Sequence, residues 1–459
     1  MKLAITLSLV TLSLSKGGAG SRRHPEPVTL SLSKGEGWCS CAGHARRIAW
    51  GMRRFLIGVA AGGVLGYAFV RTREALAERS EPAPPLAPDP KAYGALRRSL
   101  MLGGMARSLA ALACAAFVLG PLVEWHPASE SDAERKEDAN AKPEPRLRRM
   151  ALVAGFVTAS AALDLPADYV EGLVLERRYG LSKQTDRDWL VERAKGFGLS
   201  LAVALPLIEL LAFAVEKLPR SWPAVATAGS FPLLVLANVV VPTFVAPLFN
   251  DFTPIEGEFA DRVRELAARF GAGDATLLRV DMSRQTEKAN AYVTGLLGTK
   301  RIVIGDTLLD RFEPDETIFV VAHELGHYVK GDVWRGVALG MAAAGFVFFG
   351  GRALADRPGR SLADTAGLAR LFFAMSLLGS LAGPPLSAFS RSREREADRF
   401  ALEATKDGAS GAAAFSRLRD RNLAEDEQPK WMEVLFSSHP SLRSRIARLE
   451  LSARSTAGS

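Results

Sequence analysis

Seven apolar runs most restrict how this 459-residue chain can fold. In lipid an extended backbone finds no hydrogen-bonding partner, so apolar runs of this length are expected to cross a membrane as helices. The runs are residues 55–70, 101–123, 150–169, 199–215, 222–249, 337–353 and 368–389. Hydrophobic residues make up 48% of the chain, which agrees with a mainly α-helical polytopic membrane protein.

Charge and cysteine content exclude other classes. The net charge is +8, but the Lys and Arg residues cluster beside apolar runs, a pattern typical of membrane flanks, and no nucleic-acid partner is expected. Only Cys39, Cys41 and Cys114 are present, too few for a disulfide framework or a four-cysteine zinc site. A bound metal would therefore have nitrogen and oxygen ligands.

The N-terminal region looks unlike the rest. The segment TLSLSKG at 11–17 recurs word for word at 29–35, among Gly, Ser and Pro residues. Residues 1–51 are expected to be low-complexity and either disordered or not native. Two alternatives stay open: a poor signal peptide, or a translated upstream repeat with the true start at Met52.

The segment HELGH at 323–327 carries the chemistry. On a helix, His323 and His327 lie four residues apart on one face and can bind one zinc ion, with Glu324 placed as the general base for a metal-activated water. Pro314 suits the first turn of this helix, and Gly331 offers a stop. The alternative is a structural histidine pair at a helix end.

A third zinc ligand is predicted downstream at Glu394. Asp398 follows one helical turn later, where its carboxylate can accept the free ring N–H of a ligand histidine. Read alone, this segment would be a solvated helix face of mixed charge. The two apolar runs after His327 return the chain to the same membrane side, which allows Glu394 to meet both histidines.

Residues 250–330 read as a soluble α+β segment, with a helix at 259–270 and strands at 276–282 and 290–294. A further strand at 301–305 is expected to pair back across the turn Gly298-Thr299. A strand ahead of the zinc helix could accept a peptide as an additional strand. Near the C-terminus, His439 and Arg445 are candidates for holding a substrate carbonyl or the oxyanion. The alternative is that His439 caps the closing helix.

The chain resembles the type I CAAX prenyl endopeptidases, a family of integral-membrane zinc metalloproteases with bacterial relatives. The resemblance covers residues 150–451, and the motifs that carry it besides HELGH and 394–398 are YGLSKQT (179–185), APLFN (246–250), NAY (290–292), KRIV (300–303), DTLL (306–309) and SHP (438–440). It implies about seven transmembrane helices and a small α+β gluzincin-like protease domain. It also implies one Zn²⁺ per chain on His323, His327 and Glu394, and Asn290 and Ala291 beside the substrate backbone.

These observations predict five regions: 1–51, a membrane domain at 52–249, a catalytic part at 250–333, a transmembrane hairpin at 334–389 and a catalytic C-terminal part at 390–459. The expected function is a zinc endopeptidase acting near the C-terminus of prenylated or other membrane-associated proteins. The expected partners are a peptide or protein substrate, with or without a lipid modification, and membrane lipid. The expected location is a bacterial inner membrane with the site facing the cytoplasm.

Three alternatives remain at this stage. A quality-control protease would cleave without prenyl specificity. An intramembrane zinc protease would need HELGH inside a span, yet Lys330, Asp332 and Arg335 follow it closely. A transporter or scaffold would use its histidines structurally and its membrane aspartates functionally.

Overall fold

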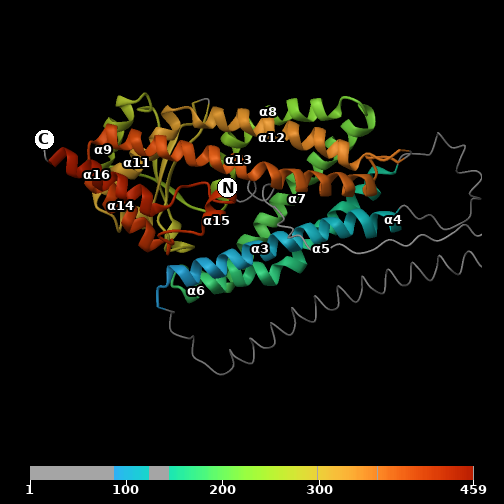
Figure 1. The fold of residues 1–459 in the computed structure, drawn as a ribbon, viewed down its shortest axis with the longest axis horizontal. Helices are drawn as coiled ribbons and strands as arrows, with labels where there is room; N and C mark the ends of the chain where they lie inside the picture. Colours follow the sequence, from blue (N-terminus) through green and yellow to red (C-terminus); the bar gives the residue numbers. More distant parts are fainter. Residues whose placement is uncertain (1–86, 124–143, 297, 359, 458–459) are drawn as a thin grey trace, which may run out of the picture.

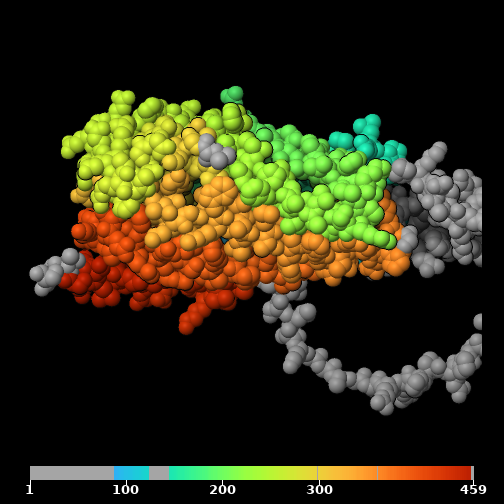
Figure 2. All heavy atoms as spheres, turned by 90° about the horizontal axis from the view of Figure 1, so that it is seen from above, coloured from blue at the N-terminus to red at the C-terminus, as the bar shows by residue number. Residues whose placement is uncertain are grey.

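The computed structural model describes residues 87–123, 144–296, 298–358 and 360–457, and the predictions for residues 1–51 and for the run at 55–70 lie outside this part. The molecule is elongated (Figure 1). Long helices run side by side at one end, and a unit containing a small sheet lies at the other. Figure 2 shows the two parts forming one continuous body.

Six segments of the described residues are long and apolar enough to cross a membrane, and they overlap the other six predicted runs. The helices that form them are α3 (Pro90–Cys114), α4 (Gly120–Val123), α5 (Arg146–Tyr169), α6 (Leu175–Arg178), α7 (Asp186–Lys217), α8 (Trp222–Val240), α12 (Asp332–Ala355) and α13 (Thr365–Thr405). Short π-helical turns continue α3 into α4, α5 into α6 and α8 toward Leu248. The prediction of a mainly helical, polytopic membrane protein is confirmed.

Large apolar side chains point outward from the membrane helices. Phe117, Leu210 and Phe244 are all more than half exposed. In water such residues would form an unfavourable patch, whereas in a bilayer they contact lipid tails.

The sheet has strand order β1-β2-β4-β3. The strands are β1 (Phe252–Pro254), β2 (Thr276–Val280), β3 (Ala291–Thr294) and β4 (Arg301–Gly305). β2 and β4 are parallel, and β3 pairs antiparallel with β4, which confirms the predicted pairing across the turn at Gly298. β3 is an edge strand of the sheet that the structure describes, so one of its sides has no strand partner there.

The helices of this unit pack around α11, which carries both histidines of HELGH. They are α9 (Glu258–Arg269), α10 (Asp306–Leu309), α11 (Pro314–Val329), α14 (Gly408–Arg421), α15 (Lys430–Leu435) and α16 (Leu442–Ala457). Phe319, Val321 and Leu325 of α11 are completely buried, and the ring of Phe319 packs edge-on against Phe415 of α14. Burying three large apolar side chains stabilises the unit by about 1.5–3 kcal/mol each, which holds α11 firmly in the core.

α13 continues without interruption from the membrane into the sheet-containing unit. It is 41 residues long and packs along α12 as a hairpin (Figure 1). The sequence predicts a span at 368–389 and a helix that carries Glu394 and Asp398, and the structure joins the two in one helix with Pro384 and Pro385 inside it. Glu394 and Asp398 are therefore carried by the extension of a membrane helix.

Candidate metal centre

α11 presents its two histidines toward the same point. Pro314 occupies the first turn, and Glu313 and Glu316 form a reciprocal capping box that fixes the start of the helix. The ring centroids of His323 and His327 are 4.9 Å apart. The helix ends at Val329 with Lys330 as its C-cap, because Gly331 adopts a left-handed conformation with φ of 69°.

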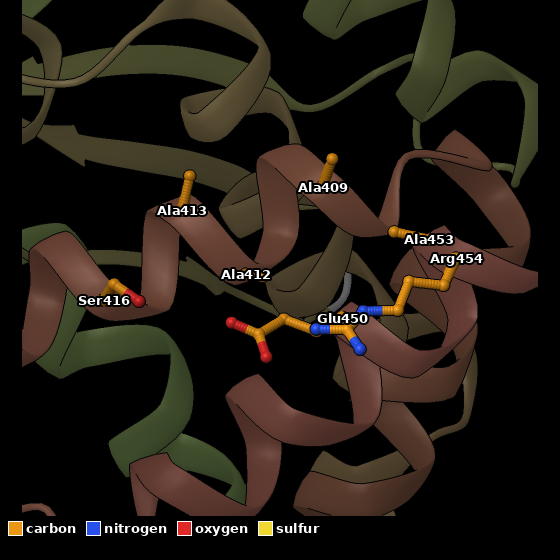
Figure 3. A pocket seen from close by; sticks show the side chains of 7 residues that line it. All are labelled: Ala409, Ala412, Ala413, Ser416, Glu450, Ala453 and Arg454. Carbon is orange, nitrogen blue, oxygen red and sulfur yellow. The ribbon is translucent and has the colours of Figure 1, made fainter. Parts of the chain in front are cut away.

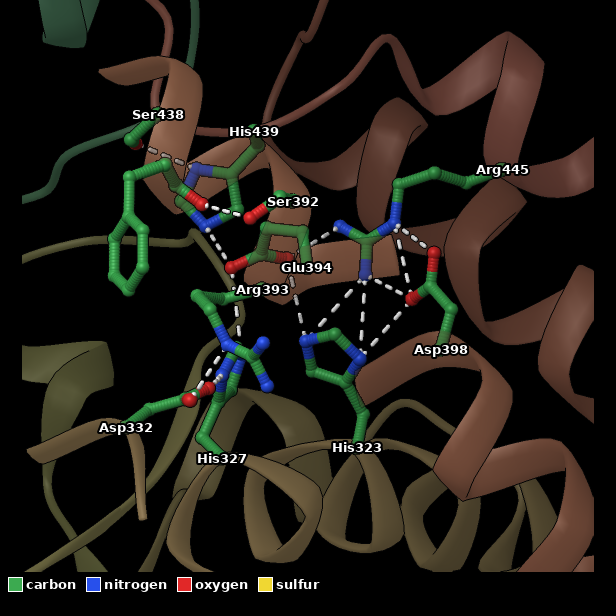
Figure 4. A network of polar contacts seen from close by, with 11 residues as sticks. His323, His327, Asp332, Ser392, Arg393, Glu394, Asp398, Ser438, His439 and Arg445 are labelled. Atoms are coloured by element: carbon green, nitrogen blue, oxygen red, sulfur yellow. Dashed lines mark hydrogen bonds and ion pairs between the residues drawn. The ribbon is translucent and has the colours of Figure 1, made fainter. Parts of the chain in front are cut away.

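Glu394 of α13 lies opposite both rings (Figure 4). Its Oε2 atom is 3.3 Å from His323 Nε2, and its Oε1 atom is 3.4 Å from His327 Nε2. The candidate ligand atoms of these three residues all lie within 4.8 Å of one another. The sequence-predicted ligands are thus brought together from two helices.

The two distances from Glu394 to the histidines match those between ligand atoms of a tetrahedral cation. Zinc bonds of about 2.0–2.1 Å place two ligand atoms of a tetrahedron about 3.3–3.4 Å apart, whereas a hydrogen bond places them at about 2.7–3.2 Å. In addition, Glu394 Oε2 is buried and makes no well-aligned hydrogen bond. An acceptor of this kind is a ready ligand for a metal ion.

A carboxylate lies behind each imidazole. His323 Nδ1 is 3.0 Å from Asp398 Oδ1, as the sequence predicts for Asp398. His327 Nδ1 is 2.9 Å from Asp332 Oδ2. Each Nδ1–H can therefore donate to a carboxylate, which leaves both Nε2 atoms as electron-pair donors toward the shared centre.

The electrostatics of the centre favour positive charge. Burial lowers the pKa of His323, but the carboxylates of Asp398 and Glu394 outweigh it and raise the pKa to about 9. Burial also lowers the pKa of His327, and Glu394 and Asp332 reverse the effect, so that its pKa is raised. Burial raises the pKa of Glu324, which moves this carboxyl toward the range suited to proton transfer near neutral pH.

Arg445 of α16 closes one side of the centre. Its Nε lies 3.0 Å from Asp398 Oδ2, its Nη1 lies 3.3 Å from Glu394 Oε2, and its guanidinium stacks 4.2 Å from the centre of the Phe415 ring. The side chain is only 7% exposed. Its polar contacts are thus with Asp398, Glu394 and the ring of His323, whose nitrogens lie 3.4 Å from Nη2 (Figure 4).

His439 approaches from the solvent side. Its Nε2 lies 3.1 Å from Glu394 Oε1, its Nδ1 lies 2.8 Å from Ser438 Oγ, and the side chain is 60% exposed. It precedes α16, with Pro440 and Ser441 between. An exposed donor beside the metal position could reach a bound substrate.

Asn290 and Ala291 lie where the chain enters β3, and β3 packs against α11. Asn290 is exposed, and its carbonyl accepts a hydrogen bond of 2.9 Å from Gly305 N. The structure describes no direct contact between these two residues and the three candidate ligands.

The sequence analysis did not identify Asp332 as a residue of this site. The residue is held by Arg393, whose Nε donates to Asp332 Oδ1 over 2.6 Å, and Arg393 directly precedes Glu394 in α13. The chain therefore links one histidine to the neighbour of the third ligand through Asp332 (Figure 4). The available signal was the acidic residue five positions after His327, immediately beyond the glycine that ends α11.

A hollow of about 430 Å³ lies elsewhere, between α14 and α16 (Figure 3). The lining residues are Ala409, Ala412, Ala413, Ser416, Glu450, Ala453 and Arg454. None of them is a candidate ligand or a neighbour of one, so this hollow is separate from the metal centre.

Two family models match consecutive parts of the chain. Residues 104–251 match the model described as CAAX prenyl protease N-terminal, five membrane helices. Residues 256–453 match the model described as peptidase family M48. The first covers membrane helices, and the second includes strands β2 to β4, α11 and the hairpin α12–α13 that carries Glu394.

Individual relatives agree with these matches. The chain is 30% identical to the CAAX prenyl protease 1 homolog of Oryza sativa, over 66% of this chain and 73% of that protein. It is 28% identical to the uncharacterized metalloprotease YhfN of Bacillus subtilis, over 66% of this chain and 74% of that protein. Among solved structures, the crystal structure of S. mikatae Ste24p is similar, with a TM-score of 0.60 and 27% identity over 68% of this chain and 78% of that one.

Proposed function

The chain belongs to peptidase family M48 and is an integral-membrane metalloprotease, and on this basis we propose that it holds one zinc ion on His323, His327 and Glu394. The observation that carries the proposal is the convergence of these three side chains from α11 and α13, with candidate ligand atoms within 4.8 Å of one another. The buried Oε2 of Glu394, which accepts no hydrogen bond from the described residues, supports it.

The proposed reaction is hydrolysis of a peptide bond. A zinc ion bound at this centre supplies a Lewis acid that polarises the carbonyl and lowers the pKa of water. Glu324 takes a proton from the attacking water and then delivers it to the departing amine. The raised pKa of Glu324 suits both steps, since the carboxyl must accept and release a proton in one turnover.

We assign different roles to His439 and Arg445. His439 is exposed beside Glu394 and can donate a hydrogen bond to the developing oxyanion. The sequence predicts that Arg445 binds substrate. Its burial against Asp398 and Glu394 supports a role in holding those two carboxylates in place.

The proposed substrate is an extended peptide paired with the free side of β3, so that Asn290 and Ala291 contact its backbone. Several relatives are named CAAX prenyl protease 1 or its homologs. We therefore propose cleavage near the C-terminus of prenylated or other membrane-associated proteins. A protease without prenyl specificity is the remaining alternative. The relative YhfN is consistent with it, because its name specifies no prenylated substrate.

The proposed location is a bacterial inner membrane with the metal centre on the cytoplasmic side. The short connection between α7 and α8 carries just Lys217 and Arg220, whereas the preceding connection and the side of the metal centre carry more Lys and Arg. The basic cluster Arg146-Arg148-Arg149 argues for the opposite orientation. The two earlier alternatives are not retained. α11 is not among the candidate spans of the described residues, which argues against an intramembrane site, and membership of a peptidase family argues against a transporter or scaffold.

Two variants test the metal chemistry. Glu324→Gln should keep one zinc per chain, because the ligands are intact, and should lose peptidase activity by about 10²- to 10⁴-fold, the usual worth of general acid–base catalysis. His323→Ala should lose both zinc and activity. Metal analysis and peptide cleavage by the purified proteins measure these outcomes, and full proteolysis by Glu324→Gln would exclude the mechanism.

Substrate class is tested separately. A peptide ending in a cysteine-containing C-terminal motif should be compared in its farnesylated and unmodified forms. A kcat/KM at least about tenfold higher for the farnesylated peptide would support prenyl specificity, since that ratio corresponds to about 1.4 kcal/mol of differential binding in the transition state. Equal values would favour the broader protease.

A further inference from the structure

The segment at 285–290 leads into the edge strand β3 and contacts the ends of the membrane helices. It comes directly before Ala291, the first residue of β3, and contains Asn290 at its end. On the proposed function, the position of this segment decides where a bound peptide lies relative to the metal. Its contacts therefore bear on substrate binding.

One set of contacts comes from the YGLSKQT loop at 179–185, between α6 and α7. The carbonyl of Leu181 accepts hydrogen bonds from Glu287 N at 2.9 Å and from Thr286 Oγ1 at 3.1 Å. Ser182 Oγ donates to the carbonyl of Gln285 over 2.7 Å. The loop thus binds three consecutive residues largely through their backbones, in a manner that fixes chain position more than side-chain identity.

A second contact is a partly buried ionic cluster at the end of α6. Lys288 Nζ lies 2.7 Å from Glu176 Oε2 and 2.8 Å from the hydroxyl oxygen of Tyr93, and Tyr93 itself donates to Glu176 Oε1 over 2.6 Å. Tyr93 is 2% exposed. Because the cluster is shielded from water, its charge-assisted bonds are stronger than those of a surface pair.

The opposite side of the segment is held by the sheet-containing unit. Asn422 Oδ1 accepts from Ala289 N at 3.0 Å, and Thr307 Oγ1 donates to the carbonyl of Lys288 over 2.9 Å. The segment is therefore bound on one side by the membrane helices and on the other by the sheet-containing unit, immediately before strand β3, which packs against α11.

We propose that the loop 179–185 and Glu176 form a positioning element, which sets the peptide-binding edge of β3 at a fixed place relative to the zinc site. This inference rests on the proposed function, and it assigns a role to the YGLSKQT motif. The element acts through the segment 285–290 and touches neither metal nor substrate. It makes the ends of membrane helices α3, α6 and α7 part of the substrate-binding apparatus (Figure 1).

Edge pairing is sensitive to such positioning. A peptide added to β3 makes its main-chain hydrogen bonds only where the strand edge is held in place, so an edge that shifts or frays binds the peptide less tightly. Loosening the element should therefore weaken peptide binding while leaving the ligands and Glu324 undisturbed. The expected signature is a higher KM with little change in kcat.

The test reverses the charges of the cluster. Glu176→Lys and Lys288→Glu should each lower kcat/KM for a fluorescence-quenched peptide by about tenfold through KM, and the double variant should recover most of the loss. Zinc content should stay at one per chain in all three. Ser182→Ala, which removes a single hydrogen bond, is a milder variant in case the charge reversals fail to fold.

A matched control is the ion pair between Arg98 of α3 and Glu425 after α14. It also joins the membrane helices to the sheet-containing unit, but it does not touch the segment 285–290. Arg98→Glu should leave KM within about twofold of the wild-type value, as expected when no substrate-binding contact is lost. A rise equal to that of Lys288→Glu would overturn the inference, because it would indicate general docking of the two parts.

Amide hydrogen exchange gives a readout independent of activity. Residues 286–294 should exchange faster in Lys288→Glu than in the wild type or in Arg98→Glu. Unchanged exchange, or an unchanged KM, would overturn the positioning role. If the wild-type enzyme cleaves no peptide, the proposed function fails, while the exchange measurement still decides whether the loop holds this edge.

Discussion

Replacing Asp332 with alanine is expected to weaken zinc binding while leaving all three proposed ligands in place. The carboxylate accepts from His327 Nδ1 over 2.9 Å and from Arg393 Nε over 2.6 Å. In Asp332→Ala the imidazole loses the partner that fixes its tautomer and its ring orientation. Loss of such a partner costs about 10- to 100-fold in metal affinity, or about 1.4–2.7 kcal/mol.

The stability of the fold should fall as well. Arg393 is 14% exposed, so its Nε would be left with neither Asp332 nor free access to water. An unsatisfied buried donor costs about 1–3 kcal/mol. The zinc affinity and stability of Asp332→Asn should be intermediate. Its amide oxygen can accept a hydrogen bond from either His327 or Arg393, but its NH₂ group is itself a donor and cannot accept one from the other residue.

The assay is competition for zinc against a chromophoric chelator, with thermal unfolding of the same preparations in detergent. Arg335→Ala provides the control. Arg335 contacts Asp332 at 3.3 Å from a position 47% exposed, so its loss should change the zinc Kd by less than about twofold. An unchanged Kd in Asp332→Ala would refute the reasoning, since it would mean that His327 needs no partner to present Nε2.

Two further predictions concern the same centre. In the metal-free protein, burial lowers the pKa of His323 but Asp398 and Glu394 raise it to about 9 from 6.5. The proton on His323 then stabilises the fold fully below pH 6.5, and about 3 kcal/mol of this stability is lost as the pH rises through about 9. Zinc affinity increases over the same pH range, because zinc displaces that proton. Unfolding and chelator competition across this range measure both, and an affinity independent of pH would contradict the assignment. Gly326→Val should weaken zinc binding and lower Tm, because a Cβ at Gly326 would lie 3.0 Å from Phe400 Cδ1 and 3.3 Å from Ala397 Cα, forcing α13 away from α11. Gly336→Ala, where a Cβ meets nothing within 4 Å, should change neither zinc affinity nor Tm.

Much of the architecture follows from local patterns in the sequence. Apolar runs predict the six described spans because lipid allows a spanning segment few conformations. Strands β3 and β4 follow from short apolar stretches around a glycine turn, and α11 follows from its proline start and glycine stop. In each case the interactions that determine the structure lie within about twenty residues of one another along the chain.

Features that depend on contacts between distant segments were not predicted. β1 is three residues long and exists by pairing with β2, so its own sequence carries little signal. The role of YGLSKQT depends on residues more than 100 positions later, such as Gln285. Asp332 was visible as an acidic residue, but its partnership with Arg393 spans the membrane hairpin and could be found only in three dimensions.

The long helix α13 explains why the third proposed ligand, Glu394, can be distant in sequence and still lie close to both histidines. A helix rotates by about 100° per residue, so the direction of Glu394 is fixed by the register of the membrane segment from which α13 extends. Gly326 lets this helix approach α11 closely, and Asp398, one turn beyond Glu394, meets the other side of His323. The contacts of α13 with Gly326, His323 and His327 together define how this helix lies against α11. The membrane hairpin therefore acts as the frame of the metal centre, and the alignment of Glu394 with the histidines depends on the packing of α12 against α13.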